Sequence, residues 1–342
     1  MKTARYIKYT ASIAFLLLVN LYFYFSSAFT RVGGYVIYGL LKNYYNDCGI
    51  YFIDNDYIAS PSRAADCDYE FSQLMQLKNR LDETDTALLY VNKPTKYLDD
   101  RVFDRFFVES RCNANADKLL ERLDDVGIYT LDLRRCIKDE NLNIYDMFYK
   151  TDHHWTVPAG KWGAQKTAEK LNDIIGLSAD MSIYDDKNYD FKTTKNAWVG
   201  EQGRKVSEND ITKDDYTLVT PRFETDYTFS PAEEHLGFDH FIDDPDKCDH
   251  YNYKMIGCVN NNVKSGSILM LCDSYDAVTE PFLSLAVHKT DCIVMRDSSA
   301  EMLRAKLAHN KYDAVIVCYA PFMIGAHDDP DSDNYKMFRF TQ

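Results

Sequence analysis

Short apolar runs alternate with segments of helical spacing along most of this chain. The runs have the length of buried β-strands and lie at 86–94, 127–133, 268–272, 291–295 and 313–319. The helical segments lie at 71–81, 114–125, 158–175, 276–289 and 299–309. An earlier stretch, 44–58, predicts a first strand or hairpin. The alternation of strands and helices is typical of a three-layer α/β/α fold built on a parallel sheet.

Residues 177–262 break this pattern. They follow the best-delimited helix, which has Pro158 in its first turn and Gly176 directly after its end. The segment is rich in Asp, Asn, Tyr and Thr and contains short alternating pieces such as "DYTLV". We therefore expect an insertion of small β-strands and loops, which could face a substrate, rather than a disordered linker.

The N-terminus has the pattern of a membrane anchor. Three basic residues precede the 22 uncharged residues 9–30, enough to span a bilayer as one helix. Because the basic residues lie on the N-terminal side, residues 1–8 should form a cytoplasmic tail and the domain at 45–342 should be exported. This places the protein in the cell membrane as a single-pass, extracytoplasmic protein. A cleaved signal peptide is the alternative, with Ser26 and Ala28 as small residues near a cleavage site.

Charge and cysteine content narrow the class of protein. The net charge of −14 argues against a nucleic-acid partner and against a polyanionic ligand. The nine cysteines are scattered without a CxxC motif, so a zinc ribbon is not expected. Outside the cell some cysteines could pair, and the first pairs to test are Cys112 with Cys136 and Cys248 with Cys258. The 26 tyrosines suit sugar binding or ordinary half-buried strand positions equally well.

The stretch "LCDSY" supplies a candidate nucleophile. Its apolar strand ends at Cys272, and Asp273 and Ser274 follow where a helix should begin. Ligands of open α/β sheets bind at the carboxyl ends of the strands, and free backbone N–H groups there can stabilise an oxyanion. Ser274 is therefore a candidate nucleophile. The alternative is that Asp273 or Ser274 only caps the following helix.

The stretch "TDHHWT" supplies a candidate base. In an extended segment Asp152 and His154 share a face, while His153 points elsewhere. A carboxylate beside an imidazole fixes its tautomer and stabilises the imidazolium that forms on proton uptake. A metal site is less favoured because neighbouring histidine side chains diverge, and His235 and His240 are the best remaining donors. We expect no metal or other cofactor, and we assign His153 to packing.

These motifs resemble those of the DHHW proteins, which are related to the alginate O-acetyltransferase group of SGNH-hydrolase-like proteins. The resemblance rests on "TDHHWT" followed by "PAG", on "LCDSY" 120 residues later, and on the strand-turn "YVNKPTKY" at 90–97. It implies a flavodoxin-like, SGNH-hydrolase-like α/β/α fold. It also implies a catalytic triad of Ser274, His154 and Asp152.

The resemblance further implies a membrane-anchored O-acyltransferase that acetylates a cell-surface or secreted polysaccharide through an acyl-serine. A membrane-bound O-acyltransferase would be the partner that supplies acetyl groups. Arg296 and Tyr275 could stabilise the oxyanion or line the substrate pocket. Two alternatives remain open: a carbohydrate esterase with the same triad, or a non-catalytic polysaccharide-binding protein, to which Cys272 in place of the family's glycine would point.

Overall fold

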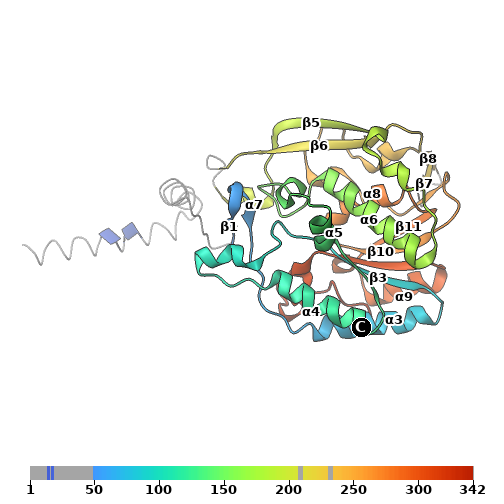
Figure 1. The fold of residues 1–342 in the computed structure, drawn as a ribbon, viewed down its shortest axis with the longest axis horizontal. Coiled ribbons are helices and arrows are strands. Elements are labelled where there is room, and N and C mark those ends of the chain that lie inside the picture. The colour runs from blue at the N-terminus through green and yellow to red at the C-terminus, as the bar shows by residue number, and fades with distance from the viewer. Residues whose placement is uncertain (1–13, 16, 19–48, 207–210, 230–233, 342) are drawn as a thin grey trace, which may run out of the picture.

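The computed structural model describes residues 14–15, 17–18, 49–206, 211–229 and 234–341. Within them an eight-stranded sheet has the spatial order β4-β3-β12-β10-β11-β9-β7-β8 (Figure 1). The strands are β3 (Ala87–Asn92), β4 (Tyr129–Asp132), β7 (Tyr227–Phe229), β8 (Glu234–Leu236), β9 (Cys258–Asn260), β10 (Ser267–Cys272), β11 (Lys289–Val294) and β12 (Ala314–Tyr319). The five strands expected from the apolar runs are thus present, within two residues of their expected ends.

The sheet is mixed, which corrects the expectation of a parallel one. The five strands from β4 to β11 pair in parallel. On the other side β9 runs antiparallel to β11, and β7 runs antiparallel to both β9 and β8. These three short strands come from residues 227–260, and no α-helix lies between them among the described residues. Without the crossover helices that parallel neighbours need, they pair antiparallel.

Helices cover both faces of the sheet, as a three-layer fold requires. They are α3 (Asp68–Asp82), α4 (Cys112–Asp125), α5 (Leu133–Asp139), α6 (Val157–Ile175), α7 (Glu201–Arg204), α8 (Glu280–Leu283) and α9 (Ala300–His309). Alternate residues of β10 face opposite layers. Leu269 and Leu271 pack in the cluster that contains α3, α4 and α9, whereas Ile268 and Met270 pack in the cluster that contains α6 and α8.

The helix expected over 276–289 does not form. The chain instead makes a 3-10 turn at Ser274–Val278 and the four-residue α8, and then turns towards β11. Almost all residues of this stretch are buried. Its apolar pattern therefore arises because the whole segment lies inside the core, and not because one face of a long helix packs against it. Ser284 ends the short helix by donating its hydroxyl to the carbonyl of Pro281 at 2.7 Å.

Other strands lie outside the main sheet. β5 (Tyr189–Trp198) and β6 (Asp214–Pro221) form a separate antiparallel ribbon within the segment expected to be an insertion. β1 (Tyr51–Phe52) and β2 (Ile58–Ala59) form a short antiparallel pair, consistent with the hairpin expected over 44–58.

The expected cytoplasmic tail and membrane anchor lie outside the described residues, apart from four residues of the span, 14–15 and 17–18, which are helical. In the part of the chain that the structure describes, no helix is both long enough and apolar enough to cross a bilayer. All eight described cysteines are free thiols, so the pairs Cys112–Cys136 and Cys248–Cys258 are not formed.

Candidate active site

The candidate nucleophile lies on a tight turn at the carboxyl end of β10. Asp273 is the N-cap of this turn and accepts the N–H of Tyr275 at 2.9 Å. The side chain of Asp276 in turn accepts the N–H of Asp273 at 3.1 Å, which completes a capping box. Asp273 therefore caps this turn, as one interpretation of the sequence predicted. Because Asp273 provides the cap, the Ser274 hydroxyl remains free for another partner.

The other partner is His154. Its Nε2 lies 2.7 Å from Oγ of Ser274, and its Nδ1 lies 2.6 Å from Oδ1 of Asp152. Because a carboxylate only accepts hydrogen bonds, Nδ1 carries the proton and Nε2 is left to accept the serine O–H. The structure thus brings together the three residues that the sequence nominated, from segments 120 residues apart.

Burial and hydrogen bonding set the protonation of this pair. Burial and the nearby imidazoles of His250 and His153 hold the pKa of His154 well below its usual range. Burial opposes the charge of Asp152, but its hydrogen bonds to His154 and the nearby His154 and His153 rings together outweigh that effect and lower its pKa. At neutral pH the site therefore holds a carboxylate and a neutral imidazole, the state that a general base needs.

The position of Asp152 depends on a close glycine contact. Its Oδ2 accepts the backbone N–H of Glu201 at 2.6 Å, at the start of α7. A Cβ at Gly200 would lie 2.2 Å from the Asp152 Cβ and 2.3 Å from Oδ2. Because only a residue without a side chain fits there, Gly200 lets the α7 turn approach the carboxylate closely.

A buried lysine binds two carboxylates of the turn that carries Ser274. Lys93 follows β3, is fully buried, and pairs with Asp273 at 2.7 Å and Asp276 at 2.6 Å. Burial works against its charge, but the two carboxylates outweigh it and raise the pKa of Lys93. Burial raises the pKa of Asp276 to about 6, although Lys93 pulls it down. The sequence motif "YVNKPTKY" contains this lysine, but nothing in the motif indicated which residues it would pair with.

His250 is a second residue that sequence reasoning missed. It comes from the 3-10 turn His250–Asn252, is completely buried, and donates from Nε2 to the backbone carbonyl of Ser274 at 2.9 Å. Its ring stacks on that of His154, with centroids 3.9 Å apart and planes 17° apart. His250 therefore fixes both the nucleophile turn and the ring of the base. No sequence motif pointed to it.

The two residues nominated for the oxyanion or pocket behave differently. Tyr275 is buried, and its hydroxyl bonds to the carbonyl of His153, so its ring is fixed beside the triad. Arg296 is partly exposed, and its nearest acidic group is that of Asp297, 3.9 Å away. Its charge acts on Tyr251, whose ring meets the His154 ring edge-on. Among the described residues Arg296 makes no hydrogen bond or ion pair with Ser274, so its role in binding an oxyanion stays a prediction.

The backbone of the turn offers one oxyanion donor. The N–H groups of Tyr275 and Asp276 are already bonded to Asp273. The N–H of Ser274 has no partner among the described residues. This group is therefore the donor that remains available to an oxyanion formed at Ser274.

His153 does not point away from the motif, in contrast to the expectation. Its ring centroid lies 3.9 Å from that of His154, and its Nδ1 lies 3.5 Å from Oδ1 of Asp152. The side chains of Asp152, His153 and His154 thus place ligand-type atoms within 4.8 Å of one another. Both nitrogens of His154 are already bonded, to Asp152 and Ser274, so the geometry favours a base over a metal ligand.

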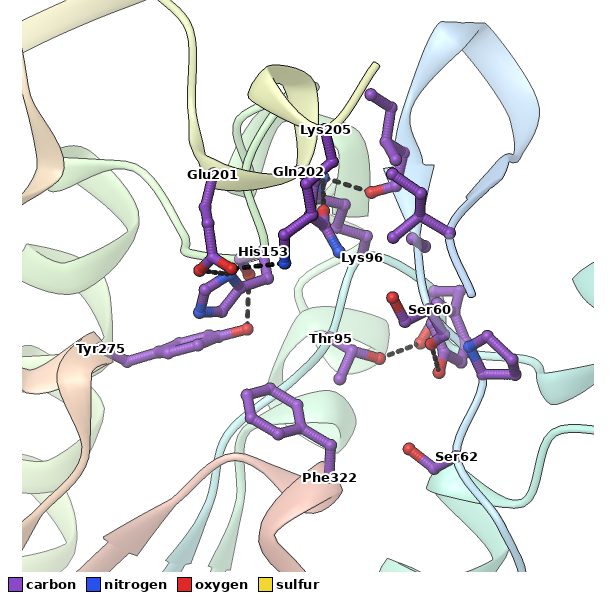
Figure 2. Close-up of a pocket in the computed structure, with 15 residues that line it drawn as sticks. Ser60, Ser62, Thr95, Lys96, His153, Glu201, Gln202, Lys205, Tyr275 and Phe322 are labelled. Carbon is purple, nitrogen blue, oxygen red and sulfur yellow. Dashed lines mark hydrogen bonds and ion pairs between the residues drawn. The ribbon is translucent and has the colours of Figure 1, made fainter. Parts of the chain in front are cut away.

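A pocket of about 260 Å³ is lined in part by His153 and Tyr275, which follow Asp152 and Ser274 in the sequence, and Figure 2 shows the residues around it. The three triad residues themselves do not line this pocket. His153, Tyr275 and Glu201 form one wall, and Ser60 and Thr95 lie on the opposite side. His153 was assigned to packing alone, whereas the structure also makes it part of this wall.

The fold and the arrangement of these residues define an SGNH-hydrolase-like protein. The chain belongs to the family described as SGNH hydrolase-like domain, acetyltransferase AlgX, whose sequence profile matches residues 51–237. The match includes Asp152 and His154 and ends before Ser274. No curated protein matches the chain.

Solved structures share the fold at low sequence identity. PatB1 from Bacillus cereus is 18% identical with a TM-score of 0.65, covering 84% of this chain and 98% of that chain. A structure of PatB1 with a sulfonyl adduct is 16% identical with the same TM-score, covering 86% and 100%. A DHHW family protein from Eubacterium siraeum is 17% identical with a TM-score of 0.65, covering 86% and 96%.

Proposed function

We propose that this protein is a membrane-anchored, extracytoplasmic O-acetyltransferase that modifies a polysaccharide through an acyl-serine. Membership of the AlgX-type family supports acetyl transfer as the reaction class. The observation that carries the proposal is the unbroken chain of short contacts from Asp152 through His154 to Ser274, at 2.6 Å and 2.7 Å. The anchor is the span expected at 9–30, and the acetyl donor is a membrane-bound acyltransferase partner.

The reaction has two halves in this proposal. His154 Nε2 takes the hydroxyl proton of Ser274 while Oγ attacks the carbonyl carbon of the acetyl donor. The N–H of Ser274 faces the oxyanion, and the imidazolium then gives its proton to the leaving group. In the second half His154 takes the proton of a sugar hydroxyl, which attacks the acetyl-serine. Collapse releases the acetylated sugar, and the proton returns to Ser274 from the imidazolium.

The first experiment asks whether the serine forms a covalent intermediate. After incubation with 4-nitrophenyl acetate, mass spectrometry should find an acetyl group on Ser274, and Ser274→Ala should carry none. A sulfonyl fluoride should label the same residue, as the sulfonyl adduct of PatB1 suggests. Labelling of the wild type at other residues only would refute the mechanism.

The second experiment separates transfer from hydrolysis. Acetylated oligosaccharide and free acetate are measured in the same reaction. An esterase would release acetate in equal amounts with and without an oligosaccharide, whereas a transferase would form the sugar ester. Because the triad acts as a unit, Ser274→Ala and His154→Ala should each remove most of the turnover. A protein that only binds polysaccharide would show neither product, which would also exclude the proposed function.

A further inference from the structure

A second lysine of the turn after β3 is buried and takes no part in the triad contacts. Lys96 is 2% exposed, and its Nζ donates to the carbonyls of Ile58 and Lys150 at 2.5 Å and 2.9 Å. It also donates to the side-chain oxygen of Gln202 at 3.1 Å, and Figure 2 shows these two side chains together. The three acceptors belong to β2, to the segment just before Asp152, and to α7. One ammonium group therefore joins three segments that are far apart in the sequence.

The short helix α7 depends on tertiary contacts for its position. It has four residues, too few to be stable as an isolated helix. The N–H of Glu201 donates to Oδ2 of Asp152 at 2.6 Å. The N–H of Gly203 donates to the carbonyl of Thr151 at 2.7 Å, and Gln202 lies between these two donors. Because the same ammonium binds Gln202 and the residue before Thr151, it ties α7 to the segment that carries the Asp152 carboxylate.

All three contacts together require the charged form of Lys96. An ammonium group has three N–H donors, whereas a neutral amine has two donors and a lone pair. Burial lowers the pKa of Lys96 to about 7, although the charges of Asp152 and Asp214 oppose this effect. Among the described residues its three partners are neutral oxygens, so no carboxylate at ion-pair distance retains its proton. When the proton is lost, one oxygen loses its donor, and the contact with Gln202 is the longest of the three.

The titratable groups that face Lys96 come from three other parts of the chain. They are Asp152 and His153 in the DHHW motif, Asp214 in β6, and Tyr57 next to β2. Burial lowers the pKa of His153, and it raises the pKa of Tyr57 to about 12. Asp152 has a lowered pKa, and burial raises the pKa of Asp214 from its usual acidic value. Of these groups we therefore expect Lys96 to be the one that loses a proton just above pH 7.

We propose that Lys96 is a positioning residue whose ammonium holds α7, and through α7 the Asp152 carboxylate, so that loss of its proton slows turnover at alkaline pH. The inference rests on the proposed function, because it concerns the regulation of that same site. When the Gln202 oxygen loses its donor, the hold on α7 weakens and the N–H of Glu201 moves relative to Asp152. A misplaced carboxylate no longer fixes the tautomer and orientation of His154.

The decisive variant is Gln202→Glu, which puts a carboxylate at the longest of the three contacts of Lys96. A negative charge this close should raise the pKa of the lysine by about one unit or more. The kcat for hydrolysis of 4-nitrophenyl acetate is measured from about pH 6 to about pH 10, with the rate of Ser274→Ala subtracted. In the wild type kcat should decline above about pH 7, and in Gln202→Glu the midpoint should move up by about one pH unit or more. A wild type without the decline, or an unchanged midpoint in Gln202→Glu, would overturn the inference.

Lys96→Met removes the ammonium group and keeps a side chain of similar length. Its kcat at neutral pH should be about tenfold lower with KM little changed, and the alkaline decline should be absent. A wild-type kcat and pH profile in this variant would refute the positioning role. If Lys96→Met does not fold, the midpoint in Gln202→Glu still decides between the outcomes.

Two control variants separate the local effect from general ones. Gln76→Glu makes the same charge change as Gln202→Glu at an exposed position of α3 and should not move the midpoint. Lys161 is 5% exposed and donates to the carbonyl of Tyr184 at 2.5 Å, so Lys161→Met removes another buried lysine. This variant should unfold at a lower temperature and keep the wild-type pH profile. An equal shift in Gln76→Glu, or loss of the decline in Lys161→Met, would contradict a role specific to Lys96.

Failure of this inference and failure of the proposed function give different results. If the wild type hydrolyses the ester with the expected pH profile but transfers no acetyl group to an oligosaccharide, the proposed function fails and the role of Lys96 stands. If the wild type acetylates the oligosaccharide but Gln202→Glu leaves the midpoint where it was, the proposed function stands and this inference fails.

Discussion

Gly200→Ala tests whether the position of Asp152 controls the activity of the site. The new Cβ would lie 2.2 Å from the Asp152 Cβ, whereas carbon atoms in contact prefer about 3.5–4.0 Å. One of the two groups must therefore move by more than about 1 Å. Movement of Asp152 would break its 2.6 Å contacts with His154 and with the N–H of Glu201.

A misplacement of this size should lower kcat by on the order of 100-fold. Overpacking of a buried site should also lower the free energy of unfolding by about 1–3 kcal/mol, which leaves the protein folded at 25 °C. Steady-state hydrolysis of 4-nitrophenyl acetate measures kcat, and thermal unfolding measures the stability. Gly257→Ala is the control, since its Cβ would meet Asp291 at 3.2 Å and not the triad.

The double variant of Gly200→Ala with Asp152→Ala tests whether the glycine acts through the carboxylate. If Gly200→Ala acts only by displacing Asp152, then adding it to Asp152→Ala should cause little further loss of kcat. Full activity in Gly200→Ala, with an unchanged unfolding temperature, would show that the carboxylate tolerates displacement. A multiplicative loss in the double variant would show that the glycine acts by another route.

The remaining predictions concern the groups around the triad. Lys93→Met should lower the free energy of unfolding by about 3–5 kcal/mol at pH 7.5, because two buried carboxylates lose their partner. The loss should be smaller at pH 5, below the pKa of about 6 of Asp276, and an equal loss at both pH values in urea titrations would contradict this. Because burial lowers the pKa of His154, its base form persists below pH 6.5, so kcat/KM for a small ester should fall only at more acidic pH; a midpoint above pH 6.5 would be inconsistent. His250→Phe keeps a stacked ring but removes the donor to Ser274, so kcat should fall about tenfold, with KM less affected and with a shifted pH profile; unchanged values would make His250 a packing residue.

The parts of the site that could be predicted from sequence are the local ones. Asp152 and His154 are two residues apart, so one backbone conformation sets their contact, and Ser274 could be placed because a buried strand ends just before it. The contacts of Lys93 with Asp273, 180 residues away, and of Gly200 with Asp152 depend on how distant segments meet. The residues that neighbour Lys93 and Gly200 in the sequence do not indicate these contacts.

The same distinction explains the errors in the fold. The helices α3, α4, α6 and α9 have one apolar face and were placed within three residues of their observed ends. The stretch 276–289 is apolar because it is enclosed on all sides, and such a run does not distinguish a long helix from two short turns. The antiparallel strands β7, β8 and β9 have three residues each, too few to show a period of two clearly.

The order in which the chain is made bears on when the serine can react. β10 lies between β11 and β12, both of which are translated later, and the N–H of Ala320 holds the Oδ2 of Asp273 at 2.7 Å. A nascent chain that has emerged only as far as residue 300 therefore contains His154 and Ser274. It still lacks β12 and the backbone N–H of Ala320, which hold the Ser274 turn in position. We therefore expect the serine to become reactive only after β12 and Ala320 have been translated and have joined the sheet.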